Sequence, residues 1–321
     1  MASHFHITTL FVALVLAGCD YNRPSQDSLF EKLGSQDTGI VFINHLPETA
    51  DFNILNYLYY YNGGGVAAGD VNGDGLPDLY FTSNLGANRL YLNKGDFVFE
   101  DVTEFAGVTG PDGWTSGVTM ADVNGDGLLD IYVSAVHYDV MAGRNILYIN
   151  NGDGTFSDRT DVFGLSHEGF STQALFFDFD GDDLLDMYLL NHSVHTERAL
   201  GNIDFRKQHH PLAGDRLFRN VGGRFEDVTA EAGIIGTVDG YGLGVVASDL
   251  DNNGCLDLFV ANDFHENDFL YINNCDGTFT ESISKAMTHT SRFSMGVDAA
   301  DISNDGRPDI MVLDMLPEDE H

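Results

Sequence analysis

The sequence predicts an all-β protein, a β-propeller of four-stranded antiparallel blades, and three observations support this prediction. A nine-residue acidic loop occurs five times along the chain, with starts 52 to 71 residues apart. A segment of small residues opened by Gly precedes four of the five loops. Short apolar and aromatic segments joined by Gly and Asn turns follow the loops. Four short strands in roughly 50 residues is the period of a propeller blade.

The five loops share one pattern of oxygen-bearing side chains. Positions 1, 3, 5 and 9 carry Asp, Asn or Ser, and position 6 is Gly in four of the five loops. Loop by loop, these side chains are Asp70, Asn72, Asp74 and Asp78; Asp122, Asn124, Asp126 and Asp130; Asp178, Asp180, Asp182 and Asp186; Asp249, Asp251, Asn253 and Asp257; and Asp301, Ser303, Asp305 and Asp309. Oxygens at alternate positions of a tight loop are the ligands that Ca²⁺ requires. We therefore expect these residues to bind Ca²⁺.

Other cations fit the loops less well. Mg²⁺ prefers rigid shells rich in water, and Zn²⁺ requires His or Cys, of which the loops contain only Cys255. For any single loop, the alternative is an Asx-rich turn without a metal. Two loops depart from the pattern. Asp183 stands at position 6 of the third loop, where it must adopt the turn without Gly, and Ser303 should weaken binding in the fifth.

The segments around each loop should form strands in a fixed order. Small residues such as Gly65–Gly69 suit an innermost strand, where blades converge, and the loop leads to a second strand such as Leu79–Thr82. The third strand is aromatic, as in Arg89–Asn93, and the clearest fourth strands are Phe97–Thr103 and Phe225–Thr229. No stretch sustains a helical apolar pattern. A parallel β-helix, the architectural alternative, would have shorter and more regular repeats.

The fifth unit has two strands, at Phe293–Ala300 and Ile310–Leu313, before the sequence ends. We therefore expect an incomplete ring with five blades present, in a chain that is a fragment of a longer protein. The alternative is that Ile40–His45 and Asn53–Tyr61 complete the fifth blade.

Composition excludes two classes of protein. The chain has 50 Asp and Glu against 15 Lys and Arg, a formal net charge of −35, so a nucleic-acid partner would meet like-charge repulsion. Its 43% hydrophobic and 12% aromatic residues are enough to build a core, which argues against disorder.

The amino terminus resembles a bacterial lipoprotein signal. Ile7–Leu16 is an apolar run too short to span a bilayer, and small residues directly before Cys19 resemble a lipobox. The resemblance implies lipidation of Cys19 and export to the bacterial cell envelope, with membrane contact only through the lipid. The n-region lacks Lys and Arg, and a core segment with a chance Cys is the alternative. The expected organisation is a signal peptide at 1–18, a tether at 19–37 and a propeller at 38–321.

Export would place the other two cysteines in an oxidising space. Cys255 and Cys275 flank two expected strands, Leu256–Asn262 and Phe269–Asn273, and a hairpin centred near His265 would set them opposite each other. We predict a disulfide between them. Two unrelated buried thiols are the alternative.

The Asp-rich loops between first and second strands resemble FG-GAP/VCBS repeats, the Ca²⁺-binding blades of integrin-α-type β-propellers. Tyr61–Asp70, Phe99–Thr103, Phe225–Thr229 and Asp314–Glu318 are similar to segments of the cartilage-acidic-protein-like bacterial proteins, which often carry a C-terminal ASPIC/UnbV domain. The resemblance covers residues 38–318. It implies the repeat type and bound Ca²⁺ but little about biochemical activity.

The leading functional hypothesis is a Ca²⁺-stabilised, lipid-anchored module that binds a protein or glycan outside the cytoplasm. Each ion would neutralise a carboxylate cluster and lock the turn between the two inner strands. We find no catalytic arrangement of Ser, His and Asp, no paired carboxylates and no phosphate loop, so we expect no enzyme. The alternatives are a propeller-type polysaccharide-degrading enzyme and a scaffold for a C-terminal domain.

One irregular stretch, at about 192–215, interrupts the repeat. It contains His192, His195, His209, His210, Arg198, Arg206 and Lys207. A long surface loop without a specific role is one interpretation, and a ligand-contacting loop is the other. The loops around His137 and His265 could lie on the same face.

Overall fold

Antiparallel strands make up most of the regular structure of the chain, whose computed structural model describes residues 30–111, 113–138, 141–193, 212–236, 240–264 and 266–315. The helices described are single turns: α1 (Ser35–Thr38), α2 (Thr103–Ala106), α3 (Thr160–Phe163) and α4 (Ile283–Ala286). Within these ranges every helix is too short to span a lipid bilayer. The chain divides after Gly34 into two units, and all strands belong to the second. Cys19 and the expected signal peptide lie outside the described residues.

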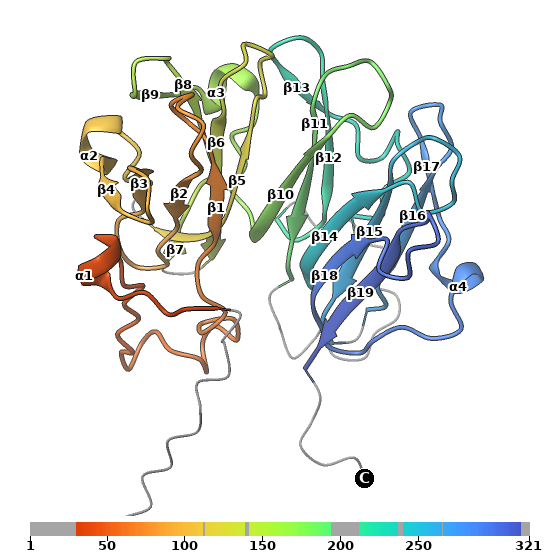
Figure 1. Cartoon of the computed structure of the whole chain (residues 1–321). Helices are drawn as coiled ribbons and strands as arrows, with labels where there is room; N and C mark the ends of the chain where they lie inside the picture. The colour runs from red at the N-terminus through yellow and green to blue at the C-terminus, as the bar shows by residue number, and fades with distance from the viewer. Residues whose placement is uncertain are drawn as a thin grey trace, which may run out of the picture. The chain divides into compact units, whose positions relative to one another are not determined.

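The strands pair with their neighbours in the sequence to form successive antiparallel sheets (Figure 1). The first sheet contains β1 (Val66–Gly69), β2 (Asp78–Phe81), β3 (Arg89–Asn93) and β4 (Phe99–Asp101). The second contains β5 (Trp114–Ala121), β6 (Asp130–Tyr138), β8 (Ile146–Asn150) and β9 (Phe156–Asp158), with β7 (Met141–Ala142) paired to β6. The third contains β10 (Ser171–Phe177), β11 (Asp186–Asn191), β12 (Arg216–Asn220) and β13 (Phe225–Asp227). The fourth contains β14 (Gly242–Ser248), β15 (Asp257–Asn262), β16 (Phe269–Asn273) and β17 (Phe279–Glu281), and the last has β18 (Ser294–Ala300) and β19 (Asp309–Asp314).

The prediction of four-stranded antiparallel blades is therefore confirmed. No closed ring is present in the part of the chain that the structure describes, as the sequence also predicts.

The first strands of successive sheets approach one another closely, which explains their small residues. Thr119 of β5 donates its hydroxyl to the carbonyl of Ala174 in β10, at 2.6 Å. At Gly117, a Cβ atom would collide with the carbonyl oxygen of Thr172. Only glycine permits the strands to lie this close.

Large side chains of the second, third and fourth strands fill the space between neighbouring sheets. Tyr188 and Leu217 of the third sheet, for example, pack with Val260 and Tyr271 of the fourth, and all four are fully buried. A fully buried side chain of this size contributes about 1.5–3 kcal/mol to folding. Each such layer therefore stabilises the contact between two neighbouring sheets.

The fourth strands are shorter than the sequence predicts at Phe97–Thr103 and Phe225–Thr229. β4 begins later because Phe97 has a positive φ of 58°, in the turn that leads into it. It ends earlier because the Asp101 carboxylate accepts the amide N–H of Thr103 at 3.0 Å, which turns the chain into α2. The pair Asp227 and Thr229 ends β13 in the same way.

The N-terminal segments do not complete the fifth blade as strands. Residues 40–61 form no strand, and the last sheet has only β18 and β19 among the described residues. Instead, Tyr57 and Tyr60 are buried with Trp114, Phe170 and Tyr241, which belong to three different sheets or the segments beside them. This aromatic cluster was not anticipated from the sequence.

A buried polar residue directly before the third strand closes the hairpin in four sheets. This residue is Asn88, Asn145, Asp215 or Asp268. Its Oδ1 accepts an amide N–H from the second strand or from the residues just after it, at 2.8–2.9 Å. Asp215 also accepts the hydroxyl of Tyr188 at 2.8 Å. Burial raises the pKa of Asp215 to about 7. A charged carboxylate is therefore costly here.

We expect Asp215→Asn to raise the free energy of unfolding at pH 8 by about 1–3 kcal/mol more than it does at pH 4. The folded state binds the Asp215 proton up to a pH near 7, whereas the unfolded chain loses it near pH 4, so wild-type stability falls as the pH rises between these values. Urea unfolding across this range measures the effect. The exposed Asp161→Asn variant should keep the wild-type slope, and an Asp215→Asn chain with that same slope would refute the assignment.

Candidate metal-binding loops

Each acidic loop is a hairpin turn between a first and a second strand, organised around the Asp at position 1. The Asp70 carboxylate accepts the amide N–H groups of Gly73, Asp74 and Gly75 at 2.8–3.1 Å. Asp122 and Asp178 accept the corresponding three, and Asp249 and Asp301 accept two each. The loops are thus folded by backbone donors that converge on one carboxylate.

Two positions in each loop adopt left-handed backbone. Position 6 does so as predicted, and Asp183 takes the conformation without glycine, with a φ of 67°. Position 4 is also left-handed: Gly73, Gly125 and Gly181 have φ of 74–77°, and Asn252 and Asn304 have φ of 66° and 61°. The sequence signal was present, because position 4 is always Gly or Asn, the residues that tolerate this region best.

The Asp at position 9 is buried in the first four loops, where its carboxylate accepts backbone N–H groups from its own loop and from the third strand. In the second loop, Asp130 accepts the amide N–H of Val123 at 3.1 Å and that of Asn150, at the end of the third strand, at 2.9 Å. Burial raises the pKa of Asp130 to about 6 and that of Asp186 to about 7. Asp309 is only partly buried, and among the described residues its sheet has no third strand to cover it.

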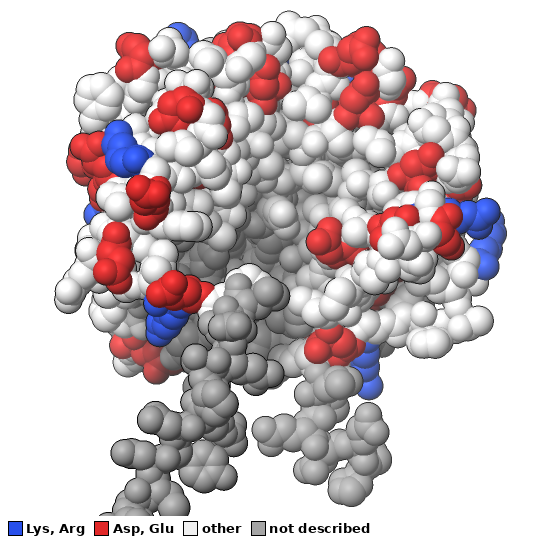
Figure 2. Space-filling view, in the orientation of Figure 1, with Lys and Arg blue, Asp and Glu red and all other residues white. Residues whose placement is uncertain are grey.

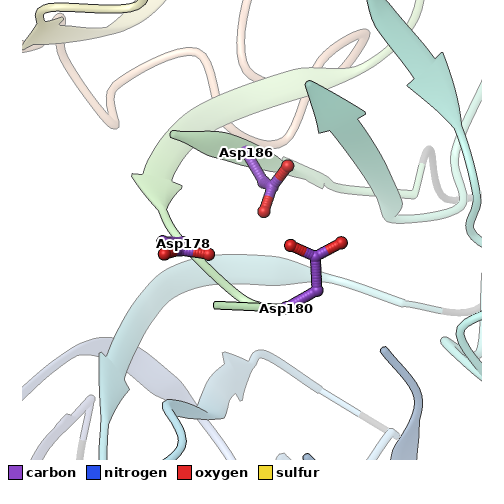
Figure 3. A group of neighbouring side chains, drawn as sticks. All are labelled: Asp178, Asp180 and Asp186. Carbon is purple, nitrogen blue, oxygen red and sulfur yellow. The ribbon is translucent and has the colours of Figure 1, made fainter. Parts of the chain in front are cut away.

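The third and fourth loops gather three carboxylates each. Asp178, Asp180 and Asp186 bring one oxygen apiece within 4.8 Å of the others, and their carboxylates face a common space in Figure 3. The fourth loop does the same with Asp249, Asp251 and Asp257. The remaining loops cannot form this trio, since their position 3 is Asn72, Asn124 or Ser303.

The side chain at position 5 bonds to the backbone of its own loop. Asp182 is absent from the group of three, and its Oδ1 accepts the amide N–H of Leu184 at 2.9 Å. Asp74, Asp126, Asn253 and Asp305 each accept the N–H two residues on in the same way. One oxygen of each position 5 side chain is thus turned to the loop backbone.

The donors of these two loops fit a hard cation. Three carboxylates at this spacing repel one another, and Oδ1 of Asp180 is buried without a hydrogen-bond partner. Ca²⁺ binds such oxygens and would relieve both penalties. Cys255 cannot act as a thiolate ligand, because it is joined to Cys275 by the disulfide that the sequence predicts, with a Cα–Cα distance of 5.8 Å.

The loops are also linked from sheet to sheet by an Asn that ends the third strand. Asn150 donates its side-chain amide to the carbonyl of Val71 in the preceding loop at 2.8 Å. Asn220 reaches Val123 and Asn273 reaches Phe179 in the same way, at 3.2 and 2.8 Å. The recurring Asn was visible in the sequence, but its partner lies 79 to 97 residues away and could not be read from it.

The histidine-rich stretch is only partly described. His192 is buried and stacks on Phe170, and its Nε2 lies 2.8 Å from the hydroxyl oxygen of Tyr57, so it belongs to the aromatic cluster rather than to a surface loop. Asp215 at the far end is buried too. His137 lies within β6 rather than in a loop. His195, Arg198, Arg206, Lys207, His209, His210 and His265 lie outside the described residues.

Acidic side chains are spread widely over the face shown in Figure 2, with few Lys and Arg among them. The sheets and loops together define a β-sheet repeat protein with an acidic turn in each repeat, and two of these turns gather three carboxylates that could hold a metal ion. A family model described as an FG-GAP-like repeat matches residues 70–133, 135–189 and 249–312, which is more than half of the chain. The chain belongs to the FG-GAP repeat family.

The chain is also similar to longer proteins that share one name. Cartilage acidic protein 1 from Homo sapiens is 28% identical over 263 residues, covering 78% of this chain and 35% of that protein. The protein of the same name from Xenopus tropicalis is 27% identical over 240 residues, covering 73% and 33%. The chain thus spans about a third of the length of these relatives.

Two solved structures resemble the chain more distantly. An Agrocybe aegerita lectin, described as recognising non-reducing terminal N-acetylglucosamine, has a TM-score of 0.43 at 19% identity, covering 77% of this chain and 59% of the lectin. The V. cholerae biofilm matrix protein Bap1 has a TM-score of 0.37 at 14% identity, covering 77% and 34%.

Proposed function

We propose that the chain is a Ca²⁺-stabilised binding module, lipid-anchored at Cys19 in the bacterial cell envelope, which recognises a protein or glycan outside the cytoplasm. The observation that carries the calcium part is the convergence of three carboxylates in each of two loops. The anchor rests on the sequence around Cys19 alone.

The residues that would hold the ions are the oxygen donors of the loops. In the third and fourth loops these are Asp178, Asp180 and Asp186, and Asp249, Asp251 and Asp257. Bound Ca²⁺ supplies positive charge that offsets the repulsion between these carboxylates. The position 1 and position 9 carboxylates then keep their backbone N–H partners, so the ion would strengthen a turn that the chain already forms.

We propose a binding role over catalysis because most of the described loop carboxylates are hydrogen-bonded to the backbone and hold the loops in shape. Those at positions 1 and 9 accept backbone N–H groups that fold the turn and join strands. A general acid or base needs a carboxyl group that is free to exchange protons with a substrate. Loops held on rigid sheets are, in turn, common carriers of binding residues.

We expect chelation with EDTA at low ionic strength to lower the melting temperature of the whole chain. Without Ca²⁺ the carboxylates of the third and fourth loops repel one another, and their partial burial limits screening of this repulsion by solvent. Asp251→Asn should lose part of the Ca²⁺ response in calorimetric titration, whereas Asp276→Asn, an exposed Asp in the same sheet, should not. A melting curve that EDTA leaves unchanged would contradict the calcium proposal.

The binding proposal is tested with glycan and protein arrays probed by the full chain in Ca²⁺. We expect retention of a ligand with no change in its covalent structure. Release of oligosaccharides from a retained polysaccharide would show catalysis and refute a pure binding role.

The lipid anchor is tested by expressing the chain with its native leader. Cys19→Ala should release the chain from the membrane fraction, and a variant that stays there would refute lipidation at Cys19.

A further inference from the structure

The third loop differs from the others in its charge. It holds five Asp in nine residues, at positions 178, 180, 182, 183 and 186. A basic side chain faces this loop: Nε of Arg219, on β12, lies 2.8 Å from Oδ2 of Asp180. The N–H does not point at the oxygen well enough for a hydrogen bond, so the contact is an ion pair.

The arginine is specific to this sheet. Each third strand ends in Asn, and the residue before that Asn is Leu92 in β3, Ile149 in β8 and Ile272 in β16. In the third sheet the same position is Arg219. The repeat therefore places a cation beside the loop with the most carboxylates.

The ion pair changes how Asp180 sits in its loop. Position 3 is Asn72, Asn124 or Asp251 in the first, second and fourth loops. In each of these loops its Oδ1 accepts the backbone N–H of position 5, at 2.9–3.0 Å. Among the described hydrogen bonds, Asp180 makes no such bond, and its Oδ1 is left buried and without a partner. The side chain is turned toward the guanidinium and toward Asp178 and Asp186.

Neighbouring groups hold the guanidinium in place. It lies over the ring of Phe179, 5.3 Å from the centroid, in a cation–π contact. A Cβ added to Gly277, in the turn before β17, would lie 3.1 Å from Nη2 of Arg219. The arginine is thus packed between the third loop and the next sheet, and only about a third of its side chain is exposed.

We propose that Arg219 is a built-in counter-cation of the third loop, which competes with Ca²⁺ for Asp180 and lowers the affinity of that loop. The inference rests on the proposed calcium function. Positive charge beside the carboxylates replaces part of the attraction that a divalent ion would gain and repels the ion itself. The same charge stabilises the loop when Ca²⁺ is scarce.

The test is Arg219→Ile, which installs the residue that the second and fourth sheets already have at this position. In calorimetric titration of the full chain, we expect one site to bind Ca²⁺ roughly three- to tenfold more tightly than in the wild type, the range expected for loss of one partly exposed ion pair plus charge repulsion. In EDTA the variant should melt below the wild type, and saturating Ca²⁺ should close that gap.

The matched control is Arg144→Ile, which removes the same charge from an ion pair outside the loops. Nη2 of Arg144 lies 2.6 Å from Oδ2 of Asp158, and the Arg144 side chain is about as exposed as that of Arg219. This control should leave every Ca²⁺ affinity unchanged. Arg219→Gln also removes the charge but keeps a polar side chain, so it should show the same gain in affinity and tests the proposal if the Ile variant folds poorly. Arg219→Lys keeps the charge and should stay close to the wild-type affinity.

The outcomes separate the two proposals. If the wild type binds Ca²⁺ and Arg219→Ile binds it with unchanged affinity, the counter-cation role is refuted and the calcium function stands. An equal gain in Arg144→Ile would also refute it, because the effect would then be one of net charge. If neither the wild type nor any variant binds Ca²⁺, both proposals fail.

Discussion

The architecture depends on a buried carboxylate that joins three pieces of backbone in each complete repeat. Asp186 begins the second strand, accepts the amide N–H of Phe179 from its own loop at 3.1 Å, and accepts that of Asn220 at the end of the third strand at 2.8 Å. The Asn220 side chain then reaches the loop of the preceding sheet. Loop, hairpin and neighbouring sheet are therefore fixed by one connected set of hydrogen bonds.

That arrangement carries an electrostatic cost that shapes the rest of the loop. An Asp without exposed surface resists ionisation, and the pKa of Asp186 rises to about 7 for this reason. Asp178 and Asp180 lie close by, so ionisation of all three requires a compensating charge. A bound cation is one source, and Arg219 is another that the chain supplies itself.

The sequence was informative wherever the repeat expresses a local rule. Acid spacing, Gly at position 6 and the small first strands follow from backbone geometry, so the loops and the order of the strands could be predicted. The ends of the fourth strands were missed because Asp101 and Asp227 cap the backbone rather than extend it. The role of position 4 was also readable, from Gly and Asn alone.

Other features depend on contacts between residues distant in the chain. The partner of Asn150 is 79 residues earlier, and Tyr57 meets His192 across 135 residues. Arg219 reads as an exposed strand residue until the fold brings it to Asp180, 39 positions before it. The Asn recurs in the sequence, but nothing there marks its partner in the preceding sheet, and the pairs Tyr57–His192 and Arg219–Asp180 belong to no repeat.

Hydrogen exchange at the two amides that Asp130 accepts, those of Val123 and Asn150, tests the central role of this carboxylate most directly. One amide lies in the loop and the other in the third strand, so ordinary loop mobility would give them very different rates. We predict strong and nearly equal protection at both sites, lost together in Asp130→Ala. Exchange of Val123 at the rate of an exposed loop amide, with Asn150 protected, would contradict the account.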